Sequence, residues 1–412
     1  MHFLNRVVFC YLTSLIPIIS DAGGFQVNLQ GQKQTGMGHC GTSLSLDGSS
    51  AFFNPGAFAF LDSNSISLGT SFVMSKVSYL AIYPSVYTSE SVSDVATPFT
   101  LYSNVRIPCT NRWNLGLAVY TPFGSGIAYK DDWIGQFVLR KMSLRMIFTQ
   151  PTLGFKINEK IGIGAGFVYG NGKFLMEKAI QVQFQNGDYG SVLLTGMGKG
   201  YGFNAGINVK PSEDLSLGLS YRSQLKVDMQ EGLAVFDVPA ALSDSFPQTN
   251  FTTSITLPDV ISAGVSYYLN EKLLLAFDYN YVGWKIYDTL AFDFELNTEN
   301  LQDVASARKY QNNMIFRIGT QIELSNDLFI RAGVYYDITP VKEGYLTPET
   351  PDNNKLGITA GWTWQWTNRL QLNTSFLYIH TQPRTDINLE TAFGGTWQDK
   401  AFIPGLGLEY TF

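Results

Sequence analysis

Apolar and polar residues alternate with a period of two through most of this chain, which is the pattern of β-strands. In residues 356–367 one face carries Trp362, Trp364 and Trp366, whereas the other is mainly threonine, glycine and glutamine. Similar alternation occurs in residues 161–169, 215–222, 273–281 and 370–378. The polar faces lack the many lysines and glutamates of a soluble sandwich. The pattern therefore favours an all-β membrane barrel with an apolar exterior and a polar lumen.

Fourteen antiparallel strands are expected, and their connections alternate in length. The expected strands lie near 65–74, 98–107, 112–121, 140–157, 161–176, 200–210, 214–225, 258–269, 272–284, 306–324, 327–338, 354–367, 369–381 and 400–412. The long connections are 75–97, 122–139, 177–199, 226–257, 285–305, 339–353 and 382–399. An even strand number permits closure without a free edge. Bacterial barrels place short turns in the periplasm, so both termini are expected there.

The stretch from Gly23 to Leu61 does not follow this strand pattern. It holds glycines at 23, 24, 31, 36, 38, 41, 48 and 56. Such a segment loses much backbone entropy on ordering, so it needs an enclosing wall. We expect a plug in the lumen at residues 23–62, with the transmembrane barrel formed by residues 63–412.

Residues 1–22 have the features of a signal peptide. Arg6 precedes the mostly apolar run from Val7 to Ile19, and Ser20-Asp21-Ala22 provides a small-x-small cleavage site. A membrane-anchoring helix is the alternative, but the run is shorter than the roughly 20 apolar residues that a span requires. The chain is therefore predicted to be exported.

The pattern of the C-terminal strand also indicates an exported membrane barrel. Phe402, Leu406, Leu408, Tyr410 and the terminal Phe412 share one face. An amphipathic last strand that ends in an aromatic residue resembles the signal that the barrel assembly machinery reads in outer membranes. We therefore expect this machinery to be a partner and bacterial outer-membrane lipid to surround the barrel.

Composition limits the fold classes, partners and cofactors that are expected for this chain. Aromatic residues make up 14% of the chain and charged residues only 15%, which suits a barrel with aromatic belts. The net charge is -6 without a basic stripe, so nucleic acid is not an expected partner. After cleavage Cys40 and Cys109 remain, which permits one disulfide or two separate thiols. No cofactor or metal site is indicated.

Three segments of the predicted plug resemble a known family. Phe25–Asn28, Gly36-Met37-Gly38 and Ala51–Gly56 are similar to the N-terminal hatch of the FadL/TodX (OMPP1) family of outer-membrane channels for hydrophobic compounds. The family hatch carries Asn-Pro-Ala where this chain has Asn54-Pro55-Gly56, although Asn-Pro is also a common turn. The resemblance implies a gate formed by Gly23, Phe25, Asn54, Pro55 and Gly56.

The resemblance continues at Trp113–Gly124 and Asp131–Gly135. It implies that the third strand is kinked inward near Pro122-Phe123-Gly124, which would open the wall beside the hatch. A lateral exit would spare an apolar solute the cost of crossing water, about 0.8 kcal/mol per methylene. Without the resemblance, these three residues would simply begin an extracellular loop.

The family likeness also implies capture of substrate by the loops 177–199 and 226–257. Apolar residues available for a surface groove there are Leu193, Leu194, Met197, Val235 and Phe236. Arg222 and Arg317 fall on inward-facing positions and are candidates for binding a ligand carboxylate. For Arg317, a salt bridge with Asp278 on the neighbouring strand is an equal alternative.

These expectations define a monomeric channel for passive uptake of hydrophobic molecules, with long-chain fatty acids as the favoured substrate. Aromatic hydrocarbon uptake by the same mechanism is the first alternative, and a general porin or a structural barrel is the second. An enzyme is disfavoured, because the mature chain has only His39 and His380 and no spacing groups a nucleophile with a base. The sequence leaves the substrate and the gating mechanism open.

Overall fold

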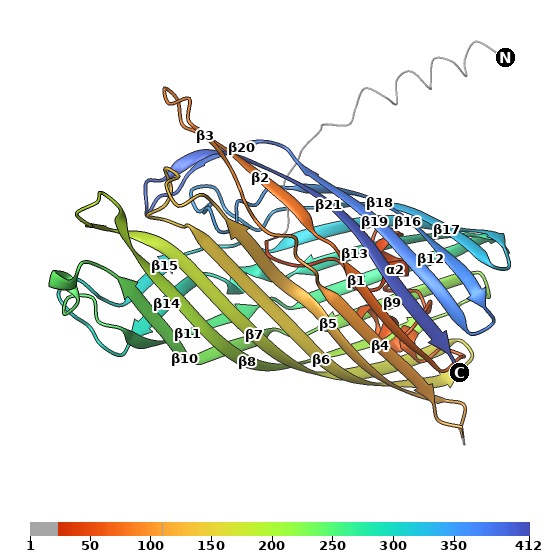
Figure 1. The fold of residues 1–412 in the computed structure, drawn as a ribbon. Coiled ribbons are helices and arrows are strands. Elements are labelled where there is room, and N and C mark those ends of the chain that lie inside the picture. Colours follow the sequence, from red (N-terminus) through yellow and green to blue (C-terminus); the bar gives the residue numbers. More distant parts are fainter. Residues whose placement is uncertain (1–23, 109) are drawn as a thin grey trace, which may run out of the picture.

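The computed structural model describes residues 24–108 and 110–412, and their strands form one antiparallel sheet that closes on itself (Figure 1). Fourteen strands make up the ring, as predicted. In order they are β1 (Ser65–Ser71), β4 (Phe99–Arg106), β5 (Trp113–Ala128), β6 (Lys141–Asn158), β7 (Ile161–Gln183), β8 (Tyr189–Val209), β9 (Leu215–Arg222), β12 (Val260–Asn270), β13 (Leu273–Val282), β16 (Asn313–Ser325), β17 (Leu328–Asp337), β18 (Lys355–Thr367), β19 (Leu370–Thr381) and β21 (Gly394–Thr411). Closure occurs where β1 pairs with both β4 and β21.

Seven further strands extend the wall at the end away from the C-terminus (Figure 1). They are β2 (Met74–Ala81), β3 (Thr88–Glu90), β10 (Leu225–Asp237), β11 (Thr249–Leu257), β14 (Thr289–Phe294), β15 (Val304–Ala307) and β20 (Arg384–Ile387). The expected long loops at 75–97, 122–139, 177–199, 226–257, 285–305 and 382–399 are therefore wrong in part, because each contains strand residues, whereas 339–353 contains no strand. β7 and β8, for example, remain paired as far as Gln183 and Tyr189.

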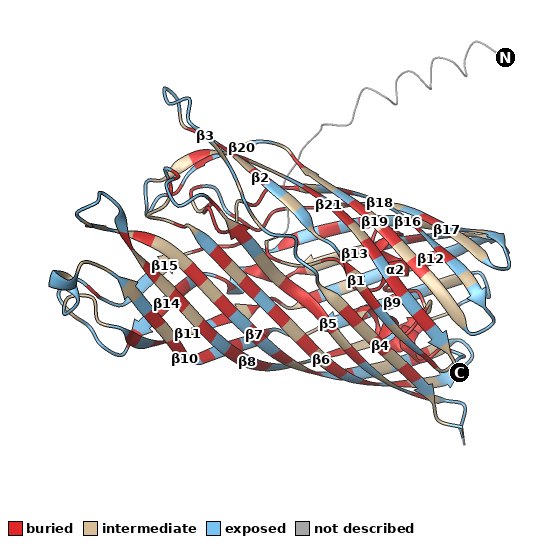
Figure 2. Cartoon of the chain, viewed as in Figure 1, coloured by how far each residue is buried: buried red, intermediate tan, exposed pale blue. Residues whose placement is uncertain are grey.

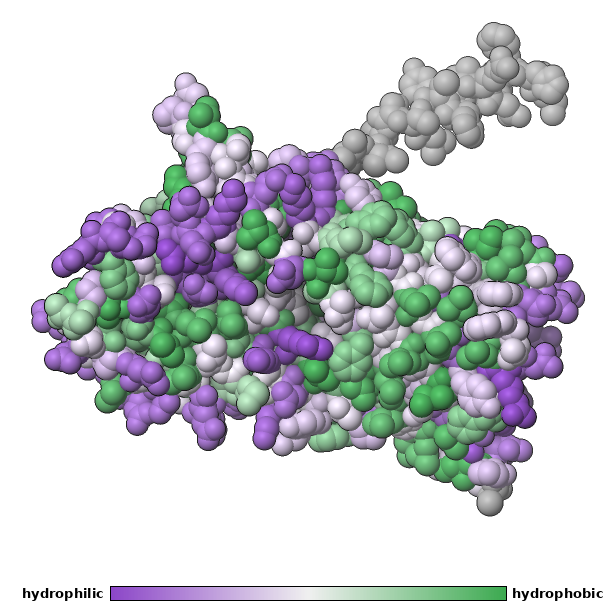
Figure 3. Space-filling model, viewed as in Figure 1, coloured by the Kyte–Doolittle hydropathy of each residue, from purple (hydrophilic) through white to green (hydrophobic). Residues whose placement is uncertain are grey.

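The outward and inward faces of the main wall follow the predicted alternation. Trp362, Trp364 and Trp366 are 50%, 47% and 61% exposed, whereas Thr359 and Thr363 on the same strand are buried in the interior. Figure 2 shows this alternation of buried and exposed residues along the strands. On the face drawn in Figure 3, apolar residues cover much of the wall nearer the C-terminus, and hydrophilic residues are more frequent toward the opposite end. The wall thus presents an apolar belt.

Residues 24–61 fill the lumen near the C-terminal end of the barrel (Figure 1). This hatch contains three single turns of helix, α2 (Gln32–Thr35), α3 (Ser50–Phe53) and α4 (Pro55–Phe58). α4 lies on the inner faces of β6, β7 and β8. A Cβ on Gly164 would lie 2.2 Å from the Pro55 carbonyl oxygen, so glycine on the wall permits this close approach.

Other expectations concern the signal peptide, Gly23 and the two cysteines Cys40 and Cys109. The predicted signal peptide, Gly23 and Cys109 lie outside the described residues. Cys40 is a free and fully buried thiol that lies 3.8 Å from the Ala276 carbonyl oxygen. No helix in the described ranges is long and apolar enough to cross a membrane.

Candidate functional site

The wall changes partner at the position where the sequence predicted a break. β4 pairs with β5 only from Thr100 opposite Tyr120 down to Arg106 opposite Asn114. β5 continues to Ala128 along β6, with a register shift between Tyr120 and Phe123. Pro122, Phe123 and Gly124 are thus strand residues, and the alternative that they begin a loop is wrong.

The hatch takes the place of β4 along this part of β5. The Val27 amide donates to the Pro122 carbonyl at 2.8 Å, and the Gly124 amide donates to the Phe25 carbonyl at 3.0 Å. Gln26 forms an isolated antiparallel bridge with Phe123. Proline lacks an amide hydrogen but keeps its carbonyl, so this pairing uses the one hydrogen-bonding group that Pro122 offers. The N-terminal end of the hatch therefore covers an edge that β4 leaves unpaired.

A cavity of about 480 Å³ lies beside this edge. Its inner lining comes from the hatch, the extended loop before β18 and the inward faces of β17, β19 and β21, including Leu29, Tyr335, Leu377, Ile379 and Ile403. Its outer lining comes from the segment 93–98 and from Gly124 to Ile127, together with the outward-facing Arg145. Val95 is 53% exposed, so the same cavity touches both the lumen and the outer surface of the wall.

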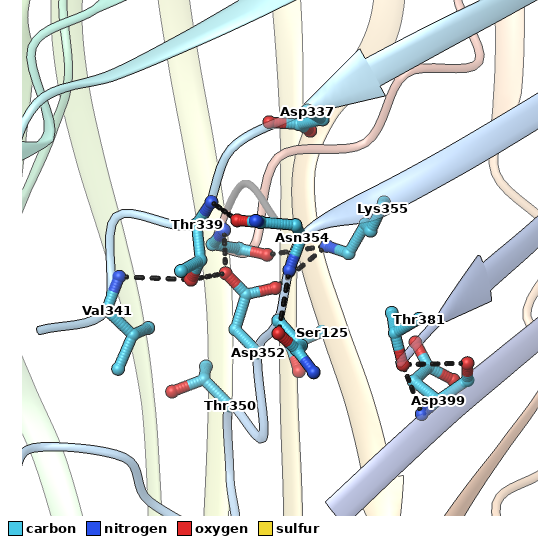
Figure 4. Close-up of polar contacts among 12 residues, drawn as sticks. Ser125, Asp337, Thr339, Val341, Thr350, Asp352, Asn354, Lys355, Thr381 and Asp399 are labelled. Carbon is cyan, nitrogen blue, oxygen red and sulfur yellow. Dashed lines mark hydrogen bonds and ion pairs between the residues drawn. The ribbon is translucent and has the colours of Figure 1, made fainter. Parts of the chain in front are cut away.

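A buried polar cluster that includes Thr339, Asp352 and Lys355 (Figure 4) holds the first described residue of the hatch. The Gly24 amide donates to Asp352 Oδ2 at 2.6 Å, and the Thr339 hydroxyl donates to the same oxygen at 2.7 Å. Lys355 Nζ lies 3.0 Å from Asp352 Oδ1 and donates to the Gly24 carbonyl at 3.4 Å. Burial raises the pKa of Asp352, whereas the Lys355 ammonium and the Gly24 amide act to lower it. We call Asp352, Thr339 and Lys355 the hatch latch.

Phe25, the next residue of the hatch, is held by apolar contacts. The centre of its ring lies 4.6 Å from that of Trp284, 5.5 Å from that of Tyr287 and 6.2 Å from that of Phe123, in edge-to-face arrangements. Phe25 is 5% exposed, and Trp284 is fully buried. The predicted gate residue Phe25 and the predicted wall residue Phe123 therefore meet in one aromatic cluster.

Asn54, Pro55 and Gly56 lie at the opposite side of the hatch and do not line the cavity. Asn54 Oδ1 accepts from the Gly56 amide at 2.8 Å and caps α4, while its Nδ2 donates to the Ile207 carbonyl on β8. A Cβ on Gly56 would lie 2.6 Å from the Ile207 Cα. These residues seat the hatch on the wall, which is a different position from that of Phe25.

Arg222 and Arg317 both bind the hatch. Arg222 donates to the Phe52 carbonyl at 2.7 Å and to the Tyr120 hydroxyl at 2.6 Å. Arg317 donates to Asn28 Oδ1 at 3.0 Å and to Asn280 Oδ1 at 2.8 Å.

The carboxylate of Asp278 serves the hatch in place of the salt bridge considered for Arg317. Its Oδ2 accepts from the amides of Gly41 and Thr42 at 2.8 and 2.9 Å and from the Thr42 hydroxyl at 2.7 Å. Both Asp278 and Arg317 line a cavity of about 40 Å³ between hatch and wall, and Arg317 Nη1 has no hydrogen-bond partner there.

The five predicted capture residues do not share a surface. Leu194 is buried on the inner side of β8, whereas Met197 on the outer side is 69% exposed. Leu193 lies on the outer side and pairs across to Val235 of β10, which is 37% exposed and precedes the half-buried Phe236. The single groove expected from two loops is therefore wrong, because these segments are strands whose residues alternate between faces.

Sequence reasoning missed the latch. Asp352 is 328 residues from Gly24, and Lys355 begins an otherwise regular strand, so no local pattern marks either residue. The available signal was the run Thr350–Lys355, which is rich in Asp and Asn and holds the buried residues Asp352, Asn353 and Asn354. A group of three or more side chains able to hold a metal ion is not found in residues 24–108 and 110–412.

The closed barrel, the internal hatch and the lateral cavity define a channel-type outer-membrane protein. Residues 13–412 match the family model described as outer membrane protein transport protein (OMPP1/FadL/TodX), and the chain belongs to this family. The family consists of transport channels for hydrophobic substrates and not of enzymes.

Individual relatives are distant in sequence. The chain is 22% identical to the long-chain fatty acid transport protein of Salmonella typhi over 97% of this chain and 98% of that protein. It is 25% identical to outer membrane protein P1 of Haemophilus influenzae over 52% of this chain and 47% of P1.

Solved structures of other proteins share the fold. A FadL homologue of Pseudomonas aeruginosa superposes with a TM-score of 0.83 at 18% identity, over 95% of this chain and all of that one. The toluene transporter TodX of P. putida gives a TM-score of 0.69 at 15% identity, over 95% of this chain and 99% of that one.

Proposed function

We propose that this protein mediates passive uptake of hydrophobic molecules across the bacterial outer membrane and releases them sideways through the wall beside Pro122–Gly124. In this proposal the substrate enters the barrel at the end opposite the C-terminus and reaches the cavity beside the hatch. It then leaves between the segment 93–98 and β5. Both termini face the periplasm, and the barrel acts as a monomer after insertion by the assembly machinery.

The observation that carries the proposal is the continuity of the cavity. Tyr335 and Leu377 line its inner part and Val95 its exposed outer part. β5 residues beyond Tyr120 pair with the hatch instead of β4, so opening here needs no rupture of strand–strand pairing with β4. An apolar solute that uses this path avoids exposing its methylenes to periplasmic water.

Long-chain fatty acids are the proposed substrates, in line with the named activity of the Salmonella relative. Aromatic hydrocarbons are the second candidate, because the fold is shared with a toluene transporter. In the fatty-acid proposal, Arg222 and Arg317 become available to a carboxylate when the hatch moves, since both bind hatch atoms in this structure.

The test fills the cavity without disturbing its walls. A Cβ on Gly126 meets no atom within 4 Å, so Gly126→Trp places a large side chain in the cavity. We expect uptake of a labelled fatty acid into vesicles to fall at least tenfold. Gln181→Trp, on an exposed position of β7 outside the cavity, is the matched control.

Unchanged uptake by Gly126→Trp would refute the lateral route. Parallel measurements with labelled toluene decide between the two substrate classes. Planar-bilayer conductance addresses the general porin: a channel blocked by its hatch passes few ions, whereas an open porin conducts strongly.

A further inference from the structure

Basic side chains gather on the outer surface of β6, β7 and β8, just beyond the apolar belt. Arg145, Lys173 and Lys199 are all exposed and occupy outward positions, because their neighbours along each strand are buried. Lys173 lies directly opposite Arg145, and Lys199 lies opposite Asn171 on the next strand pair. Neighbouring strands are about 5 Å apart, so the three cations span roughly 10 Å of wall.

Aromatic residues indicate the level of this cluster relative to the membrane. On β8 the outward position that follows Lys199 toward the C-terminal end is Tyr201, and on β7 Tyr169 lies two outward positions from Lys173, beyond Asn171. The rings of the two tyrosines lie 5.5 Å apart. Tyr201 also stacks on Phe167 at 6.1 Å. Tyrosines of a membrane barrel mark the boundary between acyl chains and headgroups. The three cations therefore lie at the level of lipid headgroups.

Arg145 and Lys173 are a like-charged pair at directly opposed positions, which is unfavourable in a sheet unless an anion lies between them. In residues 24–108 and 110–412 no ion pair involves Arg145, Lys173 or Lys199. Some other exposed cations do have carboxylate partners: Lys76 lies 2.6 Å from Glu90, and Lys226, on the neighbouring strand β10, lies 2.7 Å from Asp228.

A polar groove of about 650 Å³ adjoins the cluster on the same outer surface. Asp228, one of its lining residues, lies directly opposite Lys199. Hydroxyl, amide and carboxylate side chains line the groove, among them Gln230, Thr252, Ser254 and Asp293. Such groups form hydrogen bonds with sugar hydroxyls, whereas the neighbouring cations match phosphate.

We propose that Arg145, Lys173 and Lys199 bind the phosphates of a phosphorylated glycolipid of the outer leaflet, of the lipid A type, whose sugars lie along the adjoining groove. The planar guanidinium of Arg145 suits bidentate contact with one phosphate oxygen pair, and the two lysines supply further charge. Because Arg145 also lines the lateral cavity, the bound lipid stands beside the proposed exit. This inference rests on the orientation in the proposed function, in which this end of the barrel faces outward.

The experiment measures binding of fluorescent bisphosphorylated lipid A to the purified full-length barrel in a neutral detergent. The variant is Lys173→Gln/Lys199→Gln, which leaves Arg145 and the cavity intact. Each basic residue near an anionic membrane surface contributes enough to binding that the double variant should lose on the order of tenfold or more in affinity. Dephosphorylated lipid A should bind the unaltered protein as weakly as the variant binds the phosphorylated form.

The control removes two cations at the turn end of the barrel, Lys160→Gln/Lys272→Gln, where both residues are exposed. Retention of full affinity by this control supports the proposal. An equal loss in both double variants would show a general charge effect and overturn it, as would unchanged binding by Lys173→Gln/Lys199→Gln. Displacement of the lipid by an equimolar amount of inorganic diphosphate would also overturn it, because a free anion would then suffice.

Lipid binding in detergent and uptake into vesicles are separate readouts. Uptake by the unaltered protein tests the proposed function without reference to the glycolipid. Failure of one proposal is therefore distinguishable from failure of the other.

Discussion

Removal of the charge from the hatch latch tests how the N-terminal end of the hatch is held. In Asp352→Asn the side chain keeps its shape, but the Gly24 amide and the Thr339 hydroxyl lose a charged acceptor. Hydrogen bonds to charged groups contribute roughly 1 kcal/mol more than those between neutral groups. Two such bonds amount to about 2 kcal/mol, before any loss from the ion pair with Lys355 is counted. Undocking of residues 24–27 should become about thirtyfold more frequent.

Hydrogen exchange of the amides at Gly24 and Val27 measures this change, since both are hydrogen-bonded in the docked hatch. Asp386→Asn is the matched control. Asp386, in β20, is also a buried carboxylate that accepts from a backbone amide, that of Gly344, and pairs with Arg384. Arg384 donates to the Asp352 backbone carbonyl, which Asp352→Asn leaves in place, and among the described residues Asp386 has no hydrogen bond or ion pair with the hatch. If exchange at Gly24 in Asp352→Asn stays within threefold of that in Asp386→Asn, the latch does not hold the hatch.

Three further predictions concern the hatch and the wall. Gly56→Ala should weaken hatch docking by about 1–3 kcal/mol, seen as faster exchange in α4, because its Cβ would lie 2.6 Å from backbone of β8; unchanged exchange would contradict this. Ala360→Arg, in the middle of the outward face of β18, should lower the free energy of unfolding by about 2–4 kcal/mol in refolding titrations. Trp366→Arg, near the end of the same strand, should lower it by about 0–1 kcal/mol. Equal effects of the two variants would mean that the apolar belt is not centred on Ala360. Burial, and secondarily Arg317, lower the pKa of His39 well below 6.5. The unfolded hatch therefore binds more protons than the folded one below pH 6.5, and hatch stability should fall there as the pH decreases. His39→Gln should remove that dependence, as measured by exchange at pH 5 and 7.5.

The membrane-spanning part of the fold followed from the sequence because one rule governs it. Lipid outside and a polar lumen inside force apolar-out, polar-in alternation on every strand, as at Trp362 and Thr363. The same rule placed Arg222 and Arg317 in the lumen, where the structure has them. Glycines on alternate positions of β7 indicated room inside the wall, and the hatch occupies it.

The rule stopped being informative where the wall leaves the membrane. In the upper part of β8, Val192 and Leu194 are buried inside, whereas Ser191 and Thr195 face outward. Leu193 and Met197 also face outward there, so both faces carry apolar residues, and the apolar-out, polar-in alternation that identifies a membrane strand is lost. The predicted capture residues were misplaced for this reason.

The sequence by itself determined the number of strands in the closed ring, which face of each of them meets lipid, and that the glycine-rich N-terminal stretch needs a wall around it, because these depend on local periodicity and composition. Only the tertiary structure decided that Val27 pairs with Pro122 and that Gly24 is held by Asp352. Those contacts join residues that are remote along the chain and similar to many others in type. Their pairing is set by closure of the barrel around the hatch, which no local pattern encodes.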